Sequence, residues 1–359
     1  MRDLSLYLLE TAAVKNHCLS VVACALFTIS PCLALPAAAE DTIPIRIVNF
    51  NAELLNAPGV TPGTIQKYRF DHARKRHLEG VATLIETLNP DIVNLVEVSS
   101  KEAVDAVVAI LHEKGMTEYK GYHIDSNDPF TAGDVALISK IEPDLVEGQP
   151  IRTIYSEEGD PTWRESFSFI GRGGEKVTLN TSISRNSLYF LTVGGHKLGF
   201  VGLHLKSNPQ DDYSNAKRTA EAAVVRRIIN GEVTKRGYQP VVIGDLNDYD
   251  PDVPDADESR ATSTTVIRDI KDYDPAQDGP ELVNVAEKIA RQADRYTSHW
   301  DRNENGADDG DDVYTMIDHI LLPKDLMPFV TRAFICHSVG IDTSDHFAVV
   351  VDLDLPVQK

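Results

Sequence analysis

The sequence has few cysteines, a deficit of basic residues and a single long apolar run. Its 359 residues include 4 cysteines, and 35 lysines and arginines stand against 55 aspartates and glutamates, which gives a formal net charge of −20. A protein that grips nucleic acid through a broad Lys/Arg surface is basic over that face, so this mode of binding is disfavoured. A polyanionic substrate would have to meet a local basic cluster or bound cations. The alternative is that the charge only keeps an exported protein soluble.

The apolar run, Leu19–Leu35, lies near the N-terminus. An A-x-A cleavage pattern ends at Ala39, so residues 1–39 are predicted to form a secretory signal peptide that is cut near Ala39. Pro31 and the closeness of the cleavage pattern argue against a permanent membrane span. We therefore expect a secreted or periplasmic protein, with residues 40–359 as one domain and no stable membrane insertion.

Cysteine usage agrees with this interpretation. Three of the four cysteines fall within the predicted signal peptide, which leaves Cys336 alone in the mature chain. No intrachain disulfide is then possible, so the fold must depend on a large core. Cys336 ends the apolar stretch Phe334–Cys336, and we expect it to be a buried small hydrophobe rather than a nucleophile.

Strand-like and helix-like segments alternate along the rest of the chain. The predicted strands are Ile45–Asn51, Asp91–Val98, Val135–Ser139, Ser187–Val193, Leu198–His204, Val241–Ile243, Ile317–Leu322 and Ala348–Leu355. The predicted helices are Tyr68–Leu88, Lys101–Lys114 and Ser214–Ile229. Many strands with a few helices in mixed order indicate one α/β domain with a large sheet core.

Polar residues interrupt or follow these apolar strands. They are Asn51, Glu97, His204, Asp245, Asn247, Asp318, Asp345 and His346. One such residue alone is normally a surface or capping group, but strand-end groups that recur in this way can converge on one face of a sheet core. Oxygen ligands such as Glu97, Asp345 and Asn51 suit Mg²⁺, Mn²⁺ or Ca²⁺ rather than zinc. A carboxylate and two histidines remain to position water and move protons, so the set fits in-line hydrolysis of a phosphoester.

Short motifs occur at these strand ends in a fixed order. They are NFN (Asn49–Asn51), LVEV (Leu95–Val98), GDVALISK (Gly133–Lys140), GLHLKS (Gly202–Ser207), GDLND (Gly244–Asp248), IDHILL (Ile317–Leu322) and SDHFAVV (Ser344–Val350). This ordered series resembles the endonuclease/exonuclease/phosphatase superfamily, which includes deoxyribonucleases, apurinic/apyrimidinic endonucleases, bacterial sphingomyelinases and inositol polyphosphate phosphatases. The resemblance implies a deoxyribonuclease-like α/β fold, a four-layer α-β-β-α sandwich in which helices flank two packed mixed sheets. It also implies a metal-dependent phosphoester hydrolase, here a secreted bacterial-type member.

The same resemblance implies roles at a metal site. Glu97 is similar to the principal metal ligand, Asn51 supports it, and Asp345 is similar to a further carboxylate on the metal side. Asp245 and Asn247 resemble the pair that orients the attacking water and holds the phosphate. The expected ion is Mg²⁺, or Mn²⁺ or Ca²⁺ in its place.

The resemblance also implies roles for two histidines and an arginine. His346 resembles the catalytic histidine, and Asp318 resembles the carboxylate that orients it. His204 resembles the second histidine of the deoxyribonuclease and sphingomyelinase branches, which contacts phosphate or protonates the leaving group. Arg185 resembles a substrate-binding arginine of deoxyribonuclease-like members, unless it is a surface residue. The carboxylate partner of His204 stays open among Asp125, Asp128 and Asp134.

An acidic run at Asp301–Asp312 is a candidate for a structural Ca²⁺ site. It nearly matches the calcium-loop pattern, with Asp301, Asn303, Asn305 and Asp312 at loop positions 1, 3, 5 and 12. The alternative is a solvated acidic loop. A weaker candidate for a second cation site is formed by Asp248, Asp250 and Asp252.

The main basic concentration is Lys67–His77, which could contact substrate phosphates or simply be the solvated start of a helix. Several substrates remain open within phosphoester hydrolysis: DNA or RNA, sphingolipid headgroups and inositol phosphates. A phosphodiesterase or nuclease that acts as a monomer is favoured. A calcium-binding extracellular protein without catalysis, built on the same fold, is the alternative from another class.

Overall fold

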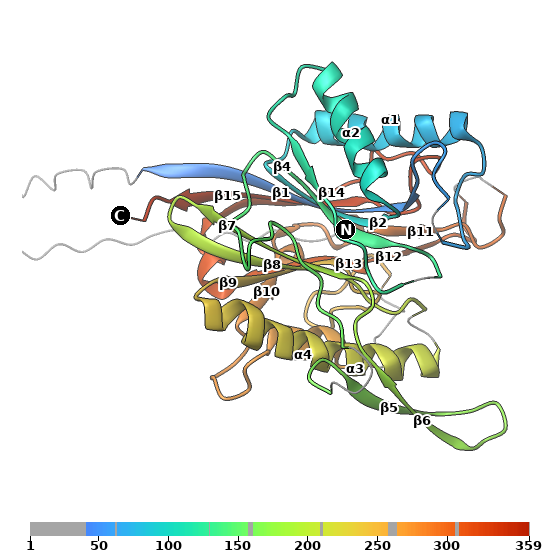
Figure 1. The fold of residues 1–359 in the computed structure, drawn as a ribbon. Coiled ribbons are helices and arrows are strands. Elements are labelled where there is room, and N and C mark those ends of the chain that lie inside the picture. The colour runs from blue at the N-terminus through green and yellow to red at the C-terminus, as the bar shows by residue number, and fades with distance from the viewer. Residues whose placement is uncertain are drawn as a thin grey trace, which may run out of the picture. The chain divides into compact units, whose positions relative to one another are not determined.

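Two mixed β-sheets form the centre of the structure (Figure 1). The computed structural model describes residues 41–61, 63–128, 130–156, 161–208, 211–257, 264–305 and 309–358, so the predicted signal peptide lies outside the described residues. The first sheet has six strands in the order β14 (Val330–Cys336), β15 (Ala348–Pro356), β1 (Thr42–Leu55), β2 (Ile92–Val98), β4 (Asp134–Ser139) and β3 (Lys120–Tyr122). The second sheet has five strands in the order β10 (Leu282–Asn284), β13 (Asp318–Pro323), β9 (Gln239–Asp245), β8 (His196–His204) and β7 (Asn186–Val193).

The central strands are apolar on both faces because each sheet is covered twice. In β2, Ile92 joins the core between the two sheets, while Val93 packs towards the helices on the other side. In β9, Val241 joins the core between the sheets and Val242 packs towards the second pair of helices. Successive residues of one strand therefore enter different cores, as the period of two requires.

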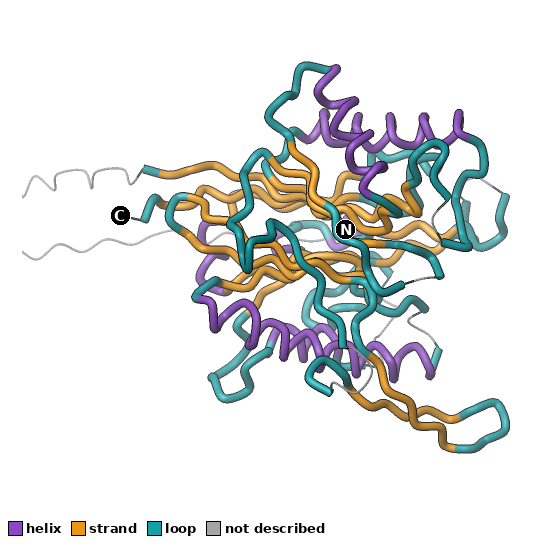
Figure 2. Tube along the Cα trace, viewed as in Figure 1, coloured by secondary structure: helices purple, strands orange, loops and turns teal. Residues whose placement is uncertain are grey.

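Helices cover the outer face of each sheet (Figure 2). The first sheet carries α1 (Asp71–Leu88) and α2 (Lys101–Glu113), and the second carries α3 (Asp212–Ile228) and α4 (Val266–Lys271). Shorter helical turns lie at Ile229–Val233, Thr234–Arg236, Val285–Lys288, Gln292–Asp294 and Lys324–Phe329. This arrangement confirms the four-layer α-β-β-α architecture. None of the helices in the described part of the chain combines the length and apolarity that a membrane crossing requires.

Two small hairpins lie outside the main sheets, and neither is among the predicted elements. One pairs β5 (Glu165–Ile170) with β6 (Lys176–Thr181) and packs the rings of Phe167 and Phe169 against Tyr213 of α3. The other pairs β11 (Ser298–Trp300) with β12 (Val313–Thr315). The strands β11 and β12 have three residues each, which is too few for an apolar alternation to show, whereas β5 and β6 do alternate over six residues each.

Two local expectations need correction. Helix α1 begins at Asp71 rather than Tyr68, because Phe70 is extended and the Tyr68 carbonyl accepts a hydrogen bond of 3.0 Å from Nε of Arg74. Cys336 is a free thiol as expected, but it is only half-buried against the helix-side core of the first sheet. It lies at the end of β14, an edge strand, where one flank lacks a covering strand.

Candidate active site

Three polar residues meet at the end of the second sheet because of strand register. In the antiparallel pair β13–β9, Asp318 lies opposite Asp245, and in the parallel pair β8–β9, His204 lies beside Asp245. All three side chains are buried. The β9 strand therefore places Asp245 between a carboxylate and an imidazole, at the point where apolar residues give way to polar ones.

The first sheet adds two further side chains at the facing strand ends. Asn51 of β1 pairs with Val96 in β2, and Glu97 follows at a register shift. Glu97 has a positive φ of 61°, so the chain is bulged there. A β-bulge re-aims a side chain relative to its neighbours, and here Glu97 faces the second sheet.

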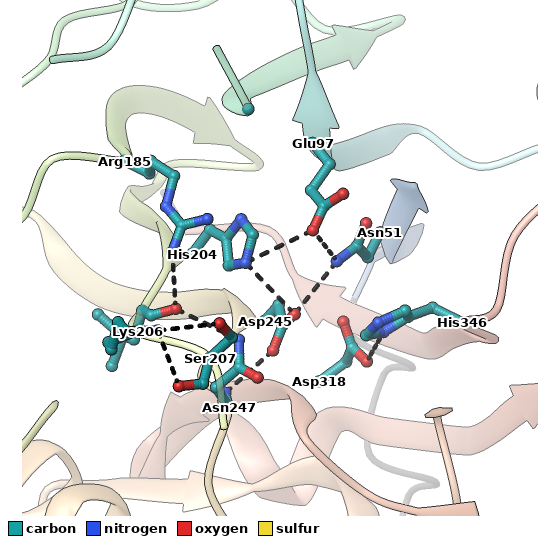
Figure 3. A network of polar contacts seen from close by, with 12 residues as sticks. Asn51, Glu97, Arg185, His204, Lys206, Ser207, Asp245, Asn247, Asp318 and His346 are labelled. Carbon is teal, nitrogen blue, oxygen red and sulfur yellow. Dashed lines mark hydrogen bonds and ion pairs between the residues drawn. The ribbon is translucent and has the colours of Figure 1, made fainter. Parts of the chain in front are cut away.

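Asn51 connects the two halves of the site (Figure 3). Its Nδ2 donates to Oε1 of Glu97 at 3.3 Å and to Oδ2 of Asp245 at 3.1 Å. His204 faces the same two carboxylates, with its Nε2 3.6 Å from Glu97 and 3.7 Å from Asp245. The predicted metal-side and water-side residues thus occupy one polar cluster.

Asp318 and His346 form a buried pair in the same cluster. Nδ1 of His346 lies 2.7 Å from Oδ2 of Asp318. Thr297 fixes the carboxylate end, since its Oγ1 accepts the backbone N–H of Asp318 at 3.0 Å. Ser344 fixes the histidine end, since its Oγ accepts the His346 N–H at 3.0 Å and donates to the Asn51 carbonyl at 2.7 Å.

Asn247 closes the turn after β9. Its backbone N–H donates to Oδ1 of Asp245 at 3.0 Å, and its Nδ2 donates to the Leu205 carbonyl at 3.2 Å. Asn247 has a positive φ of 51°, a conformation that asparagine tolerates better than most residues. This turn links the ends of β8 and β9 and holds Asp245 in place.

Burial and mutual repulsion dominate the electrostatics of the site. Burial, together with the neighbouring Asp318, raises the pKa of Asp245 to about 8. Burial also raises the pKa of Glu97 and lowers the pKa of His204 well below the usual value of 6.5. For His346, burial opposes protonation, but the Asp318 carboxylate outweighs it and raises its pKa well above 6.5.

The donor set suits a divalent cation. Asp245 and Asp318 supply buried carboxylate oxygens and Glu97 supplies a partly buried one, and Oδ1 of Asp318 has no hydrogen-bond partner among the described residues. Ligand atoms of Asp245, Asp318 and His346 lie within 4.8 Å of one another. Hard oxygen donors of this kind prefer Mg²⁺, Mn²⁺ or Ca²⁺, and a cation would offset the repulsion that raises the carboxylate pKa values.

Asp345 lies at the rim of this cluster. Its side chain is 44 % exposed, and its Oδ1 is 3.9 Å from Nε2 of His346. Its backbone N–H donates to Glu53 at 2.9 Å, and Glu53 also pairs with Lys67. Burial, followed by the Asp345 charge, raises the pKa of Glu53 to about 7. Sequence reasoning missed Glu53, although it lies two residues after Asn51.

Arg185 also lies in the site, next to the turn after β8. Its Nη2 donates to the Leu205 carbonyl at 3.1 Å, and its Nε is 3.9 Å from Asp128. Lys206 and Ser207, which continue the motif after His204, lie beside it (Figure 3). Sequence reasoning did not single out these two residues, although they belong to the GLHLKS motif that was identified.

The aspartates proposed as partners of His204 have other contacts. Oδ2 of Asp134 lies 2.8 Å from Nε2 of His123, and Asp125 is 3.8 Å from the same ring. Asp128 accepts hydrogen bonds from Thr131 and faces Arg185. Nδ1 of His204 is buried without a hydrogen-bond partner among the described residues. The carboxylates that lie nearest its Nε2 are those of Glu97 and Asp245.

The candidate calcium loop connects β11 and β12 rather than two helices. Residues 306–308 of this loop lie outside the described part of the chain. Oδ2 of Asp312 lies 2.7 Å from His299 and accepts the Asp309 N–H at 3.2 Å. Nδ2 of Asn305 donates to Asp309 at 2.7 Å, and Asp301 and Asn303 accept the Asn305 N–H at 3.2 and 3.1 Å. Calcium binding here stays a prediction.

The weaker cation candidate is neutralised by basic side chains. Asp248 pairs with Arg218 at 2.9 Å, and Lys271 pairs with Asp250 at 2.8 Å and Asp252 at 2.7 Å. A cation would have to displace these buried partners, which speaks against a site.

The basic run Lys67–His77 covers the segment before α1 and the first turns of that helix, and several of its residues have structural contacts. Arg74 is buried and donates to the carbonyls of Ala57 and Val60. Lys67 pairs with Glu53.

Comparison with known proteins agrees with the geometry. The chain matches the model of the Endonuclease/Exonuclease/phosphatase family over residues 50–346. No curated protein is similar enough in sequence to count as a relative. Among solved structures, an AP endonuclease from Archaeoglobus fulgidus has a TM-score of 0.53 and 16 % identity, covering 87 % of this chain and 100 % of its own. A 3′ phosphatase, NExo, from Neisseria bound to a product DNA hairpin has a TM-score of 0.52 and 16 % identity, covering 86 % and 99 %.

An endonuclease/exonuclease/phosphatase family protein from Leptotrichia buccalis has a TM-score of 0.52 and 14 % identity, covering 86 % of this chain and 98 % of its own. At these identities the neighbours show the fold alone, and they share the two sheets with flanking helices. The family match spans the motifs from Asn51 to His346, and it carries the assignment. The chain therefore belongs to the endonuclease/exonuclease/phosphatase family.

Proposed function

We propose that this protein is an exported, divalent-metal-dependent phosphodiesterase of the nuclease type. The observation that carries the proposal is the buried Asp318–His346 pair, with 2.7 Å between Oδ2 and Nδ1, in one cluster with Asp245, Asn51 and Glu97. Buried, hydrogen-bonded titratable groups at strand ends are costly for stability and are typical of catalytic sites.

Each residue has a role in the proposed reaction. Asp245, oriented by the Asn247 N–H, accepts a proton from the attacking water as the water oxygen bonds to phosphorus. The ester P–O bond on the opposite side breaks, and His346 gives a proton to the leaving oxygen while Asp318 holds its ring. His204, kept neutral by burial, donates a hydrogen bond to a phosphoryl oxygen. A divalent ion held by Glu97 beside Asp245 would polarise a phosphoryl oxygen, neutralise developing charge and favour the ionised form of Asp245 that this step requires.

DNA is the first substrate to test. The Neisseria neighbour is a 3′ phosphatase bound to product DNA, and the Archaeoglobus neighbour is an AP endonuclease. Both support a polynucleotide before a sphingolipid headgroup or an inositol phosphate. The net charge of −20 does not oppose this choice, because a bound cation and a local cluster can meet the phosphate.

The test is a panel assay with the purified chain. Plasmid DNA, RNA, sphingomyelin, inositol phosphates and bis-p-nitrophenyl phosphate would each be incubated with Mg²⁺, Mn²⁺ or Ca²⁺, with and without chelator. We expect metal-dependent hydrolysis of a phosphodiester that His346→Ala abolishes. Wild-type turnover by His346→Ala or Asp245→Ala would contradict the mechanism. Calcium binding without hydrolysis of any substrate would instead support a non-catalytic binding protein.

We also propose that residues 1–39 are removed on export. The apolar run Leu19–Leu35 and the A-x-A pattern that ends at Ala39 support this proposal. Mass spectrometry of the protein recovered from periplasm or medium should find a new N-terminus near Glu40. Recovery of the intact chain from the cytoplasm alone would contradict it.

A further inference from the structure

Basic side chains gather on one side of the candidate active site. Figure 3 shows Arg185, Lys206 and Ser207 on one side of His204 and Asp245, with Asp318 and His346 on the other. Nη2 of Arg185 donates to the Leu205 carbonyl at 3.1 Å, which places the guanidinium beside the backbone that leads into Lys206. In a chain with a net charge of −20, two basic side chains at one edge of the site require an explanation.

The backbone of Lys206 is fixed by two buried charges of α3. Its N–H donates to Oε2 of Glu221 at 2.8 Å, and its carbonyl accepts from Nη1 of Arg218 at 2.9 Å. Arg218 is 0 % exposed and Glu221 is 3 % exposed. Nε of Arg218 also donates to Asp248 at 2.9 Å, so the turns after β8 and β9 are held by one guanidinium.

Burying charges in this way always has a desolvation cost, which close ion pairs and hydrogen bonds only offset. Apolar residues would hold a surface turn at lower cost. The buried side chains of Arg218 and Glu221 fix the backbone of the two turns that follow His204 and Asp245. A side chain that binds a substrate needs such support to hold its position to within a fraction of an ångström.

The Lys206 side chain has no anionic partner among its described contacts. Its Nζ donates to the carbonyl and Oγ of Ser207, at 3.3 and 3.2 Å, and both acceptors are neutral. Burial, followed by the charges of Arg185 and Lys217, lowers its pKa, and the more weakly acting charges of Glu221 and Asp211 oppose this shift. The ammonium is therefore half-buried without a carboxylate of the described residues in hydrogen-bond contact, and an anion at this place would stabilise it.

We propose that Lys206 and Ser207 bind a second phosphate group of the substrate, next to the scissile phosphate. The inference rests on the proposed function. The scissile phosphate belongs beside Glu97 and Asp245, where the residues that would hold a cation lie. Lys206 and the Asp318–His346 pair lie on opposite sides of His204 (Figure 3). An anion bound by Lys206 would therefore lie next to the scissile phosphate. Such a substrate carries at least two phosphates in series or on one ring.

Kinetics on substrates with one and two phosphates test the inference. The dinucleotide d(TpT) carries one phosphate, and d(pTpT) and d(TpTp) add a second on either side, with cleavage of the internal linkage followed by chromatography. We expect the wild type to prefer one of the two-phosphate forms. In Lys206→Gln that preference should fall about tenfold, as expected for loss of a charge-assisted hydrogen bond, mainly through KM. Lys206→Arg, which keeps the charge, should restore most of it.

A matched control and a second substrate class make the result specific. Lys120 is an exposed lysine on β3 that pairs with Glu142. Lys120→Gln should leave the preference for two-phosphate substrates unchanged. A parallel comparison of inositol bisphosphate with inositol monophosphate identifies the source of the second phosphate. The dependence of kcat/KM on salt should also weaken in Lys206→Gln, because one phosphate contact is lost.

The outcomes separate this inference from the proposed function. If the wild type hydrolyses no phosphoester, the proposed function fails. If the wild type is active but Lys206→Gln loses the same factor on one- and two-phosphate substrates, the second-phosphate site is refuted while the proposed function stands. An equal loss of that kind would place Lys206 at the scissile phosphate or in the support of the turn.

Discussion

Oδ2 of Asp318 lies 2.7 Å from Nδ1 of His346, although 28 residues separate them in the chain. Each partner is fixed by a hydroxyl group at its backbone, Thr297 for the aspartate and Ser344 for the histidine. The pairing leaves Nε2 of His346 as the ring nitrogen that can reach a substrate. A carboxylate in this position selects the tautomer and stabilises the imidazolium.

Asp318→Asn should therefore reduce kcat by roughly 10²- to 10⁴-fold with little change in KM. The amide keeps the size of the side chain but removes the charge that favours protonated His346. The measurement is steady-state hydrolysis of bis-p-nitrophenyl phosphate. Asp325→Asn is the matched control, since Asp325 is exposed in the turn Lys324–Phe329, and it should behave as wild type. An equal loss of kcat in Asp318→Asn and Asp325→Asn would contradict the role proposed for Asp318.

Divalent cations should raise the thermal stability of the folded protein as well as support its hydrolytic activity. Asp245 and Asp318 are buried carboxylates and Glu97 is a partly buried one, and desolvation followed by neighbouring carboxylates raises the pKa of Glu97 and of Asp245. A cation that binds the folded state alone raises the thermal midpoint Tm by mass action. Millimolar Mg²⁺ or Mn²⁺ should raise Tm in the wild type and do so less in Glu97→Gln. The measurement is scanning calorimetry of each protein with chelator and with the metal ion. If the ion changes Tm in neither the wild type nor Glu97→Gln, the proposed metal site is contradicted.

The residues of the candidate active site were predictable because polar residues recur at the ends of several apolar strands. Asp245 and Asp318 follow or open runs such as VVI and ILL, so a pattern of neighbours along the chain is enough to find them. The four-layer fold was predictable for a related reason, since the family resemblance spans all the main strands. The Asp318–His346 contact itself was implied by the resemblance, and the structure supplies its distance.

Contacts between remote segments could not be read from the pattern. The Glu53–Lys67 ion pair and the Thr297 hydroxyl at Asp318 depend on how loops return to the site. The partner of His204 was open for the same reason, because Asp134 has a closer neighbour in His123. The β5–β6 hairpin was missed although its strands alternate apolar and polar residues, with Phe167 and Phe169 in one strand and Val177 and Leu179 in the other.

His77 should make the fold sensitive to mild acid. Burial, followed by the charge of Lys67, lowers its pKa from 6.5 to about 4. The unfolded chain therefore binds more protons between these two pH values, so stability falls as pH drops through this window. The loss contributed by His77 is about 3 kcal/mol at pH 4.

Urea denaturation at pH 7 and pH 4.5 would test this prediction. His77→Gln should lose less stability between the two pH values than the wild type. His72 is exposed on the same helix, so His72→Gln should show the pH dependence of the wild type. The same pH dependence in all three proteins would contradict the assignment to His77.

The Arg218–Asp248 pair should be the most sensitive ion pair in the fold to loss of one partner. Nε of Arg218 lies 2.9 Å from Asp248, and both side chains are almost completely buried. Removing one partner of a buried pair leaves an unpaired charge, which costs about 3–5 kcal/mol, whereas removing both is often far milder. Arg218→Met should therefore lower the urea midpoint strongly, and the double variant with Asp248→Asn should recover part of the loss. Arg291 pairs with Asp294 on the surface, so Arg291→Met should leave the midpoint almost unchanged. A midpoint for Arg218→Met no lower than that of Arg291→Met would show that the buried pair contributes nothing to holding the turns after β8 and β9.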